Sequence, residues 1–158
     1  GSYFDEPLKL DMDNLMFKGA NSAKSFISKS IEKRITKNYK KELMPFFSKL
    51  QDADAEFGYR TANEIVNYIT VYLDLQGEKK DLDHIIDTAV MQKLLPKLHG
   101  SRNKIEHILI SLGQLCLENS DLLPFDNDPS LKYPISHEKL SRMYRRVQED
   151  GFTSYAEA

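Results

Sequence analysis

The chain has little cysteine: Cys116 is the only one in 158 residues. A single cysteine excludes an internal disulfide framework and is typical of a reducing compartment, so we expect a cytoplasmic protein. Cys116 falls on the apolar face of a predicted helix, where a free cysteine behaves as a small hydrophobic residue, and we expect it in the core. The sequence also lacks any apolar run of roughly 18 residues and any signal-peptide pattern, so no membrane association is predicted.

An excess of one sign of charge is also lacking, because the formal net charge is only −2. Bulk electrostatics therefore favours neither nucleic acid nor a membrane, and any anion site must be a local patch. Hydrophobic residues make up 41% and charged residues 29% of the chain, as in an ordinary soluble globular domain. The length suits one domain, or one domain plus an extension. Gly1 and Ser2 resemble what remains of a cleaved tag, so we expect a piece of a longer protein.

Complete catalytic motifs are missing as well. Residues 19–25 place a glycine four residues before Lys24-Ser25, but a phosphate-binding loop needs a second glycine and a preceding buried strand. No acidic motif follows a strand to hold magnesium, and no serine or cysteine nucleophile has a histidine near it in sequence. The four histidines show no metal-ligand spacing, so we predict no metal site. By itself the chain is not expected to hydrolyse anything.

What the sequence does contain is a succession of helical patterns. Helices are predicted over residues 22–33, 37–52, 61–75, 81–95, 101–116 and 137–150. Asp81, Ser101 and Ser136 stand where helix caps are expected, and Gly100 and Gly151 where helices end. We therefore predict an all-α fold, a bundle of about four to six helices. Pro45 either starts or kinks the second helix, and a short β-element is weakly indicated within the first ten residues.

Residues 57–68 carry the first candidate site. A glycine turn at Gly58 is predicted to place Arg60 at a helix start, with Thr61 and Glu64 at the spacing of a capping box. Apolar and aromatic residues then recur at the spacing of a buried helix face, so Arg60 is expected to project away from it. A guanidinium held there is suited to recognising a phosphate supplied by another domain. The alternative is a surface arginine paired with Glu56 or Glu64.

Cations gather in two other places. On the last helix four basic residues lie opposite an apolar face and form a basic ridge: Lys139, Arg142, Arg145 and Arg146. This ridge is expected to contact a phosphate backbone or an acidic neighbouring subunit, unless it is only a solvated face. Arg102 and Lys104 open another helix, where the partly positive N-terminus disfavours cations. They either extend into solvent or contact a neighbour or a nucleotide.

Four stretches together resemble one known family. Residues 57–68 resemble the start of the C-terminal helical lid of McrB-like AAA+ NTPases, the motors of modification-dependent restriction systems. Residues 91–100 match that family's Q-K-x-L-P-K-x-H-G run, residues 136–143 its S-x-x-K-L-x-R-M helix, and residues 151–155 its terminal G-F-T-S-aromatic sequence. The four stretches occur in the family's order over roughly residues 55–155. Residues 3–54 match no motif of the family.

This resemblance implies a lid that closes over ATP or GTP, bound with magnesium by an upstream core, while the chain alone holds no cofactor. Arg60 would be the second-sensor arginine, with Gly58 and Tyr59 beside the nucleotide. Residues 1–54 would be a helical extension or linker from the core, and residues 55–158 the lid. Partners would be the core, neighbouring subunits of a ring, a nuclease and, through the whole protein, DNA.

Two other functions stay open at this point. A free-standing helical adaptor for protein partners predicts no phosphate-binding loop upstream in the gene. A helical nucleic-acid binder that uses the basic ridge predicts DNA affinity that falls steeply with salt. The choice between ATP and GTP, the DNA target, the ring size and the activity of the whole protein are also left open.

Overall fold

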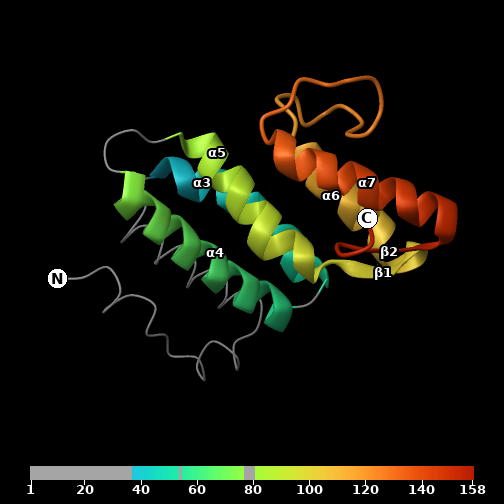
Figure 1. The fold of residues 1–158 in the computed structure, drawn as a ribbon, viewed down its shortest axis with the longest axis horizontal. Coiled ribbons are helices and arrows are strands. Elements are labelled where there is room, and N and C mark those ends of the chain that lie inside the picture. The colour runs from blue at the N-terminus through green and yellow to red at the C-terminus, as the bar shows by residue number, and fades with distance from the viewer. Residues whose placement is uncertain (1–36, 54, 77–80) are drawn as a thin grey trace. The chain divides into compact units, whose positions relative to one another are not determined.

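The computed structural model describes residues 37–53, 55–76 and 81–158. The predicted helix over residues 22–33, the motif at residues 19–25 and the N-terminal β-element lie outside these residues. Five α-helices and one small two-stranded sheet make up the regular structure of the described chain (Figure 1), so the predicted all-α class is confirmed. No helix in these ranges is both long and apolar enough to cross a membrane.

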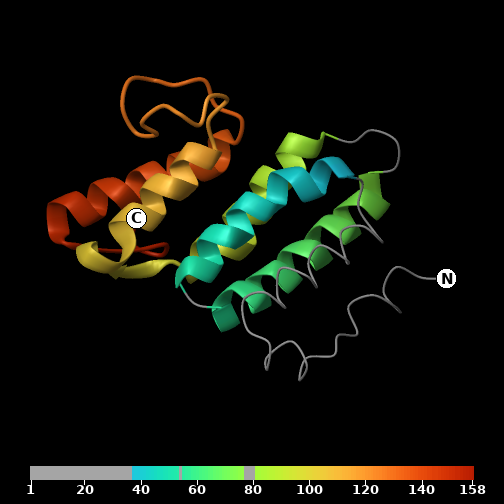
Figure 2. The same ribbon diagram turned by 180° about the vertical axis from the view of Figure 1, so that it is seen from behind.

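The chain divides into two compact units, Gly1–Leu82 and Asp83–Ala158, which we call the first and second unit. In the first unit, α3 (Lys37–Ala53) and α4 (Ala55–Gln76) form an antiparallel pair (Figures 1 and 2). Their buried apolar residues are Leu43, Phe46 and Phe47 on α3 and Ala62, Ile65, Val66 and Ile69 on α4. Pro45 lies inside α3, so this helix does not start there. The boundary predicted after residue 54 separates the lid from an extension or linker to an upstream core, and it stays a prediction.

The second unit begins with a helix that changes its winding twice. α5 (Leu82–Ala89) continues into a π-helical turn over Val90–Leu94 and a 3-10 turn over Leu95–Lys97. Pro96 explains the change, because proline donates no amide hydrogen bond and its ring crowds the carbonyl four residues earlier. The Leu95 amide accordingly reaches back five residues to the Val90 carbonyl. The buried apolar residues of this segment include Ile85, Ile86, Ala89, Val90 and Leu94.

A short sheet joins the segment that follows the 3-10 turn to the C-terminal segment of the second unit. β1 (His99–Ser101) pairs antiparallel with β2 (Phe152–Ser154), and Gly100 lies opposite Thr153. The prediction that Gly100 ends a helix is wrong, because the helical turns end at Lys97 and Gly100 lies in the strand. Its φ of +148° still suits a residue without a Cβ. Neither strand was predicted from the sequence.

Two long helices pack against each other between these strands: α6 (Arg102–Leu115) and α7 (Pro134–Asp150). Buried apolar residues on their facing sides are Ile105, Leu109, Leu112, Leu140, Met143 and Val147. Gly151 ends α7 as predicted, with a φ of +74° and its amide bonded to the Val147 carbonyl. The Gly151 carbonyl then accepts the Arg102 amide at 2.9 Å, so the end of α7 is bonded to the start of α6. Ser101 occupies the predicted cap position without a side-chain cap bond.

Candidate functional site

Arg60 lies on α4 of the first unit, and its side chain is exposed as predicted. The local geometry differs from the prediction, because α4 begins at Ala55 and runs through Gly58 and Tyr59 without a turn. A capping box provides hydrogen-bond acceptors for the free amides of a helix's first turn. Thr61 lies inside α4, where the carbonyls of the preceding turn already accept those amides, so the predicted capping box is wrong. Thr61 is buried, and its hydroxyl has no hydrogen-bond partner among the residues that the structure describes.

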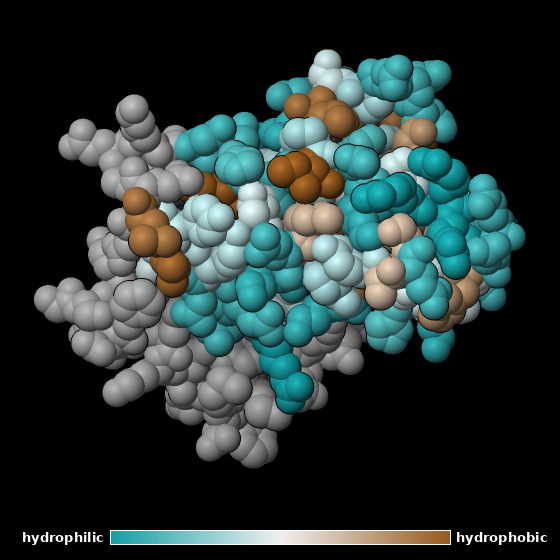
Figure 3. Space-filling model, viewed as in Figure 1, coloured by the Kyte–Doolittle hydropathy of each residue, from teal (hydrophilic) through white to brown (hydrophobic). Residues whose placement is uncertain are grey.

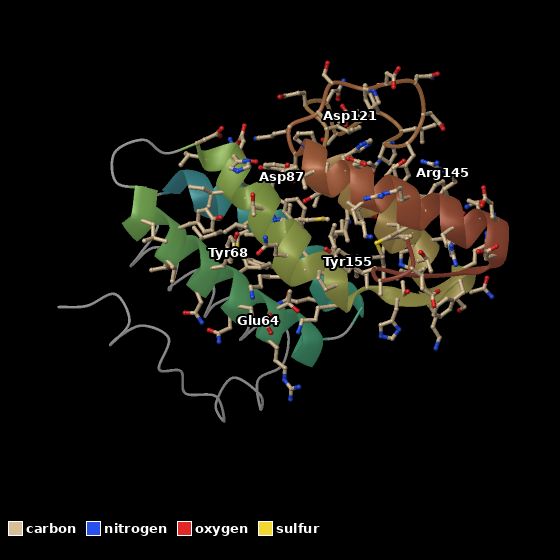
Figure 4. All side chains as sticks on the ribbon, in the orientation of Figure 1. Glu64, Tyr68, Asp87, Asp121, Arg145 and Tyr155 are labelled. Carbon is tan, nitrogen blue, oxygen red and sulfur yellow. The ribbon has the colours of Figure 1, made fainter. Side chains whose placement is uncertain are left out.

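The position of Arg60 inside a helix makes its backbone more rigid than a helix start would be. Its neighbours Thr61 and Ala62 are both fully buried, which fixes the rotation of α4 at this point. Glu64 follows one turn later on the same side of the helix, at the spacing at which opposite charges meet. Figure 4 shows Glu64 and then Tyr68 following one another along α4. The structure therefore presents one guanidinium from a fixed helical frame, with an acidic neighbour.

The basic ridge predicted on α7 is not a continuous exposed surface. Lys139 is only 8% exposed, because the segment after β2 covers it. Its Nζ donates to the Ala158 carbonyl at 2.6 Å and lies 4.4 Å from the centre of the Tyr155 ring. Burial lowers the pKa of Lys139, and the nearby charge of Arg142 lowers it further. The prediction that Lys139 is an exposed contact residue is therefore wrong.

The three arginines of the ridge remain exposed, but two of them face acids of the same unit. Arg146 lies 3.1 Å from Asp150 and 4.0 Å from Glu157, and Arg142 lies 3.9 Å from Glu138. Arg145 is exposed on the same helix (Figure 4). Such pairs reduce the positive potential that a phosphate backbone would meet. The α7 surface is consequently a weaker candidate for nucleic acid than its sequence suggests.

The strongest polar arrangement in the second unit was missed from the sequence: a buried carboxylate that caps α7. Asp87, 2% exposed, accepts the amides of Ile135 and Ser136 at 2.9 and 2.7 Å. The Ser136 hydroxyl in turn donates to the Asp87 carbonyl at 2.9 Å. Figure 4 shows Asp87 on α5 beside the first turn of α7. A carboxylate at a helix N-terminus satisfies free amides and interacts favourably with the helix dipole.

This arrangement corrects the predicted start of the last helix. α7 begins at Pro134, not His137, and Ser136 lies inside the first turn, where it is bonded to Asp87 instead of capping by itself. The sequence did contain a signal that Asp87 is buried. Asp87 precedes Val90 by three residues and Leu94 by seven, so it lies on their buried face and needs a polar partner there. Sequence alone did not identify that partner, which lies 48 and 49 residues away.

Cys116 lies in the same core. It is fully buried, as predicted, and its Sγ lies 3.4 Å from the Leu112 carbonyl. Burial raises the pKa of its thiol, and the negative charge of Asp87 raises it further. The thiol therefore stays protonated and unreactive in the folded protein. Among the described residues, no group of three histidine, cysteine or acidic side chains is placed to hold a metal ion.

A loop between α6 and α7 is held rigidly at its base. Leu117 and Leu131 form an isolated β-bridge, and the Lys132 and Tyr133 amides both donate to the Cys116 carbonyl. Phe125 of this loop stacks on Tyr144 at 4.9 Å between ring centres, and it packs directly over Gly113 of α6. These contacts fix a surface loop that contains no helix or strand of its own.

Arg102 is also engaged within the second unit. Its guanidinium donates to Glu106 at 2.9 Å and to Gln148 at 2.8 Å, and Gln148 donates back to Glu106 at 2.9 Å. The hydrogen bond from Arg102 lowers the pKa of Glu106, and that from Gln148 lowers it further. This network ties α6 to α7, so Arg102 does not simply extend into solvent.

These features define an all-α domain whose second unit is closed by a two-stranded sheet and a buried helix cap. The chain belongs to the family described as a domain of unknown function, DUF8727, whose family model matches residues 10–152. No curated protein and no solved structure shows a significant match to the chain.

Proposed function

We propose that the chain is the helical lid of a McrB-like AAA+ NTPase. In this proposal the lid closes over ATP or GTP, which is held with magnesium by a core elsewhere in the same protein. Hydrolysis then moves the lid within a ring of subunits, and the ring works in the cytoplasm with a nuclease that acts on DNA. The chain itself contributes no catalytic base and no metal ligand, only a position for the nucleotide and a lever.

The observation that carries the proposal is the convergence of stretches that resemble this family separately. The second stretch, residues 91–100, ends in β1, and the fourth, residues 151–155, contains β2, with which β1 pairs. The third stretch, residues 136–143, forms the first half of α7, whose end is bonded to the start of α6. These three stretches therefore build one substructure of the second unit, as expected if the three belong to one domain type, whereas residues 57–68 lie in the first unit.

Arg60 has the physical properties that the second-sensor role needs. Its charge persists at any physiological pH, and its planar fork of donors can bind two phosphate oxygens at once. The helical backbone around it is fixed by the burial of Thr61 and Ala62, so little backbone entropy is lost when the side chain meets its target. A γ-phosphate would compete with Glu64 for this guanidinium, which gives Arg60 two alternative partners before and after hydrolysis.

The test is ATP and GTP turnover by the whole protein that contains this chain. Arg60→Ala is expected to reduce turnover by at least about tenfold, on the order of 1.4 kcal/mol, with nucleotide binding largely kept. Arg60→Lys keeps the charge but loses the fork and should recover only part of the rate. Lys41→Ala, which removes an exposed cation from α3 of the same unit, is the matched control and should leave turnover unchanged.

Two results would contradict the proposal. If Arg60→Ala hydrolyses nucleotide as fast as the wild type, Arg60 is a surface residue and not a phosphate sensor. If the wild-type protein shows no turnover at all with its DNA present, the helical adaptor becomes the better reading.

A further inference from the structure

Charges of opposite sign are separated along the second unit. Residues 88–105 contain four basic residues, Lys93, Lys97, Arg102 and Lys104, and no acid. Residues 118–131 contain four acids, Glu118, Asp121, Asp126 and Asp128, and no base. We call residues 93–104 the basic segment and residues 118–131 the acidic loop. α6 joins them directly, so they lie at opposite ends of a helix about 20 Å long.

This arrangement works against the helix that it flanks. A helix favours acids at its N-terminus and bases at its C-terminus, but α6 has no acid in its first turn and no base in its last. Arg102 and Lys104 stand at the unfavourable end, and the acidic loop follows the other. Arg102 is stabilised by its bonds to Glu106 and Gln148, but Lys104 and the acids of the loop stand at disfavoured ends of α6. Charges that break a local stability rule in this way mark a surface kept for another purpose.

Exposed apolar side chains accompany both charged regions. In the acidic loop Leu122 is 48% and Leu123 64% exposed. Phe152 of β2, which pairs with Ser101 of the basic segment, is 45% exposed. In Figure 3 brown side chains interrupt the hydrophilic surface over the loop seen at the top of Figure 1. An apolar centre with a charged rim is the usual composition of a protein–protein contact. Here the two rims have opposite signs.

The acidic loop is also ordered before any partner arrives. Glu118 donates its amide to the Ser130 carbonyl at 2.9 Å, and Phe125 is fixed between Gly113 and Tyr144. Pro124, next to the exposed leucines, is buried, and its carbonyl lies 2.5 Å from Nε2 of His137. A loop fixed in this way loses little conformational entropy when it docks.

We propose that the acidic loop of one copy of this chain docks on the basic segment of a second copy. Leu122 and Leu123 cover Phe152, while the loop acids face Lys97 and Lys104. The partner is a second copy because this chain itself carries the complementary surface, with the apolar residue and the charges that the loop needs. The contact joins two different surfaces, so it differs from a symmetric patch that meets itself. The contact does not require nucleotide, and its test is independent of the role proposed for Arg60.

A charge swap tests this contact with the intact chain. One variant reverses the loop (Asp121→Lys, Asp126→Lys), and the other reverses the basic segment (Lys97→Glu, Lys104→Glu). Self-association is measured by sedimentation velocity over a concentration series at low salt, with circular dichroism to verify folding. The wild type should associate, and each variant alone should associate at least about tenfold more weakly because like charges then meet.

The mixture of the two variants is the decisive sample. A reversed loop is complementary to a reversed basic segment, so association should return in the mixture and weaken again at about 0.5 M salt. The control carries Glu138→Lys and Glu149→Lys, which change the same number of acids on α7 outside both surfaces, and should associate like the wild type. A wild type that stays monomeric at low salt, or a mixture no stronger than its components, would overturn the proposal.

Discussion

Removal of the Asp87 carboxylate should selectively destabilise the second unit. The perturbation is Asp87→Ala, with Asp87→Asn as the conservative variant that keeps one acceptor oxygen. In the native protein the carboxylate accepts the Ile135 and Ser136 amides at 2.9 and 2.7 Å, in a site that is 2% exposed. Both amides would lose this partner, and water cannot easily replace it at the buried Ser136 amide.

The magnitude follows from these two bonds. The buried Ser136 amide left without an acceptor costs about 1–3 kcal/mol, loss of the part-buried Ile135 bond costs about 1 kcal/mol, and the lost charge at the N-terminus of α7 adds up to about 1 kcal/mol. We therefore expect Asp87→Ala to lower the free energy of unfolding of the second unit by about 2–5 kcal/mol. Asp87→Asn should cost about half as much, because one amide keeps an acceptor while the other meets an NH₂ group.

Cys116 supplies an assay that reports on this unit alone. It is the only cysteine of the chain, and it is fully buried in the second unit. The rate at which a thiol reagent modifies it, measured over a urea series, therefore gives the free energy of opening without a contribution from α3 and α4. Asp83→Asn, an exposed acid on the same helix α5, is the control and should stay within about 0.5 kcal/mol of the wild type.

The reasoning would be refuted if Asp87→Ala opened no more readily than the Asp83→Asn control. It would also be refuted if Asp87→Ala destabilised α3 and α4 as much as the second unit, because the cap bonds lie within the second unit only.

Two further predictions concern α6. Gly113→Ala should destabilise the second unit by about 1–3 kcal/mol despite alanine's higher helix propensity, because the new Cβ would lie 2.6 Å from Phe125 Cζ and 2.8 Å from Pro124 Cβ. The same Cys116 assay measures this, and a stabilised variant would contradict it. Glu106→Gln should reduce the decrease in the free energy of unfolding that occurs on acidification. The folded pKa of Glu106 is lowered by Arg102, so its contribution is present at neutral pH and lost as pH falls below about 5. Urea unfolding at pH 7 and at pH 3.5 tests this, and equal pH dependence of variant and wild type would refute it.

Much of the helical structure could be predicted because helix signals are local. The apolar spacing of α6 and the left-handed glycine that ends α7 both act within a few residues, and both predictions are confirmed. The change from α5 to a π-helical turn was not predicted, although Pro96 marks it. The pattern alone did not show how the chain accommodates a proline in a helix that continues.

Long-range features escaped prediction for a different reason. The burial of Lys139 depends on Tyr155 and Ala158, and the cap of α7 depends on Asp87 in another helix. No periodicity encodes such contacts, because each partner looks ordinary in its own segment. For the candidate site, the exposure of Arg60 was predicted correctly, but Gly58 was assigned to a turn although it lies within α4. A glycine is tolerated inside a helix at a cost of only about 1 kcal/mol, so it is a weak stop signal.

The pairing of β1 with β2 has a consequence for synthesis on the ribosome. His99–Ser101 emerges long before Phe152–Ser154, and until the later strand appears, β1 has no partner for its backbone groups. The Asp87 cap also waits, since the amides that it accepts come from the start of α7. Bringing β1 and β2 together closes the chain between residues 101 and 152 into a loop, and the entropy cost is offset only when the contacts are complete. The first hairpin, α3 with α4, can form as soon as it leaves the exit tunnel, whereas the second unit should assemble in one late step after residue 154 has emerged.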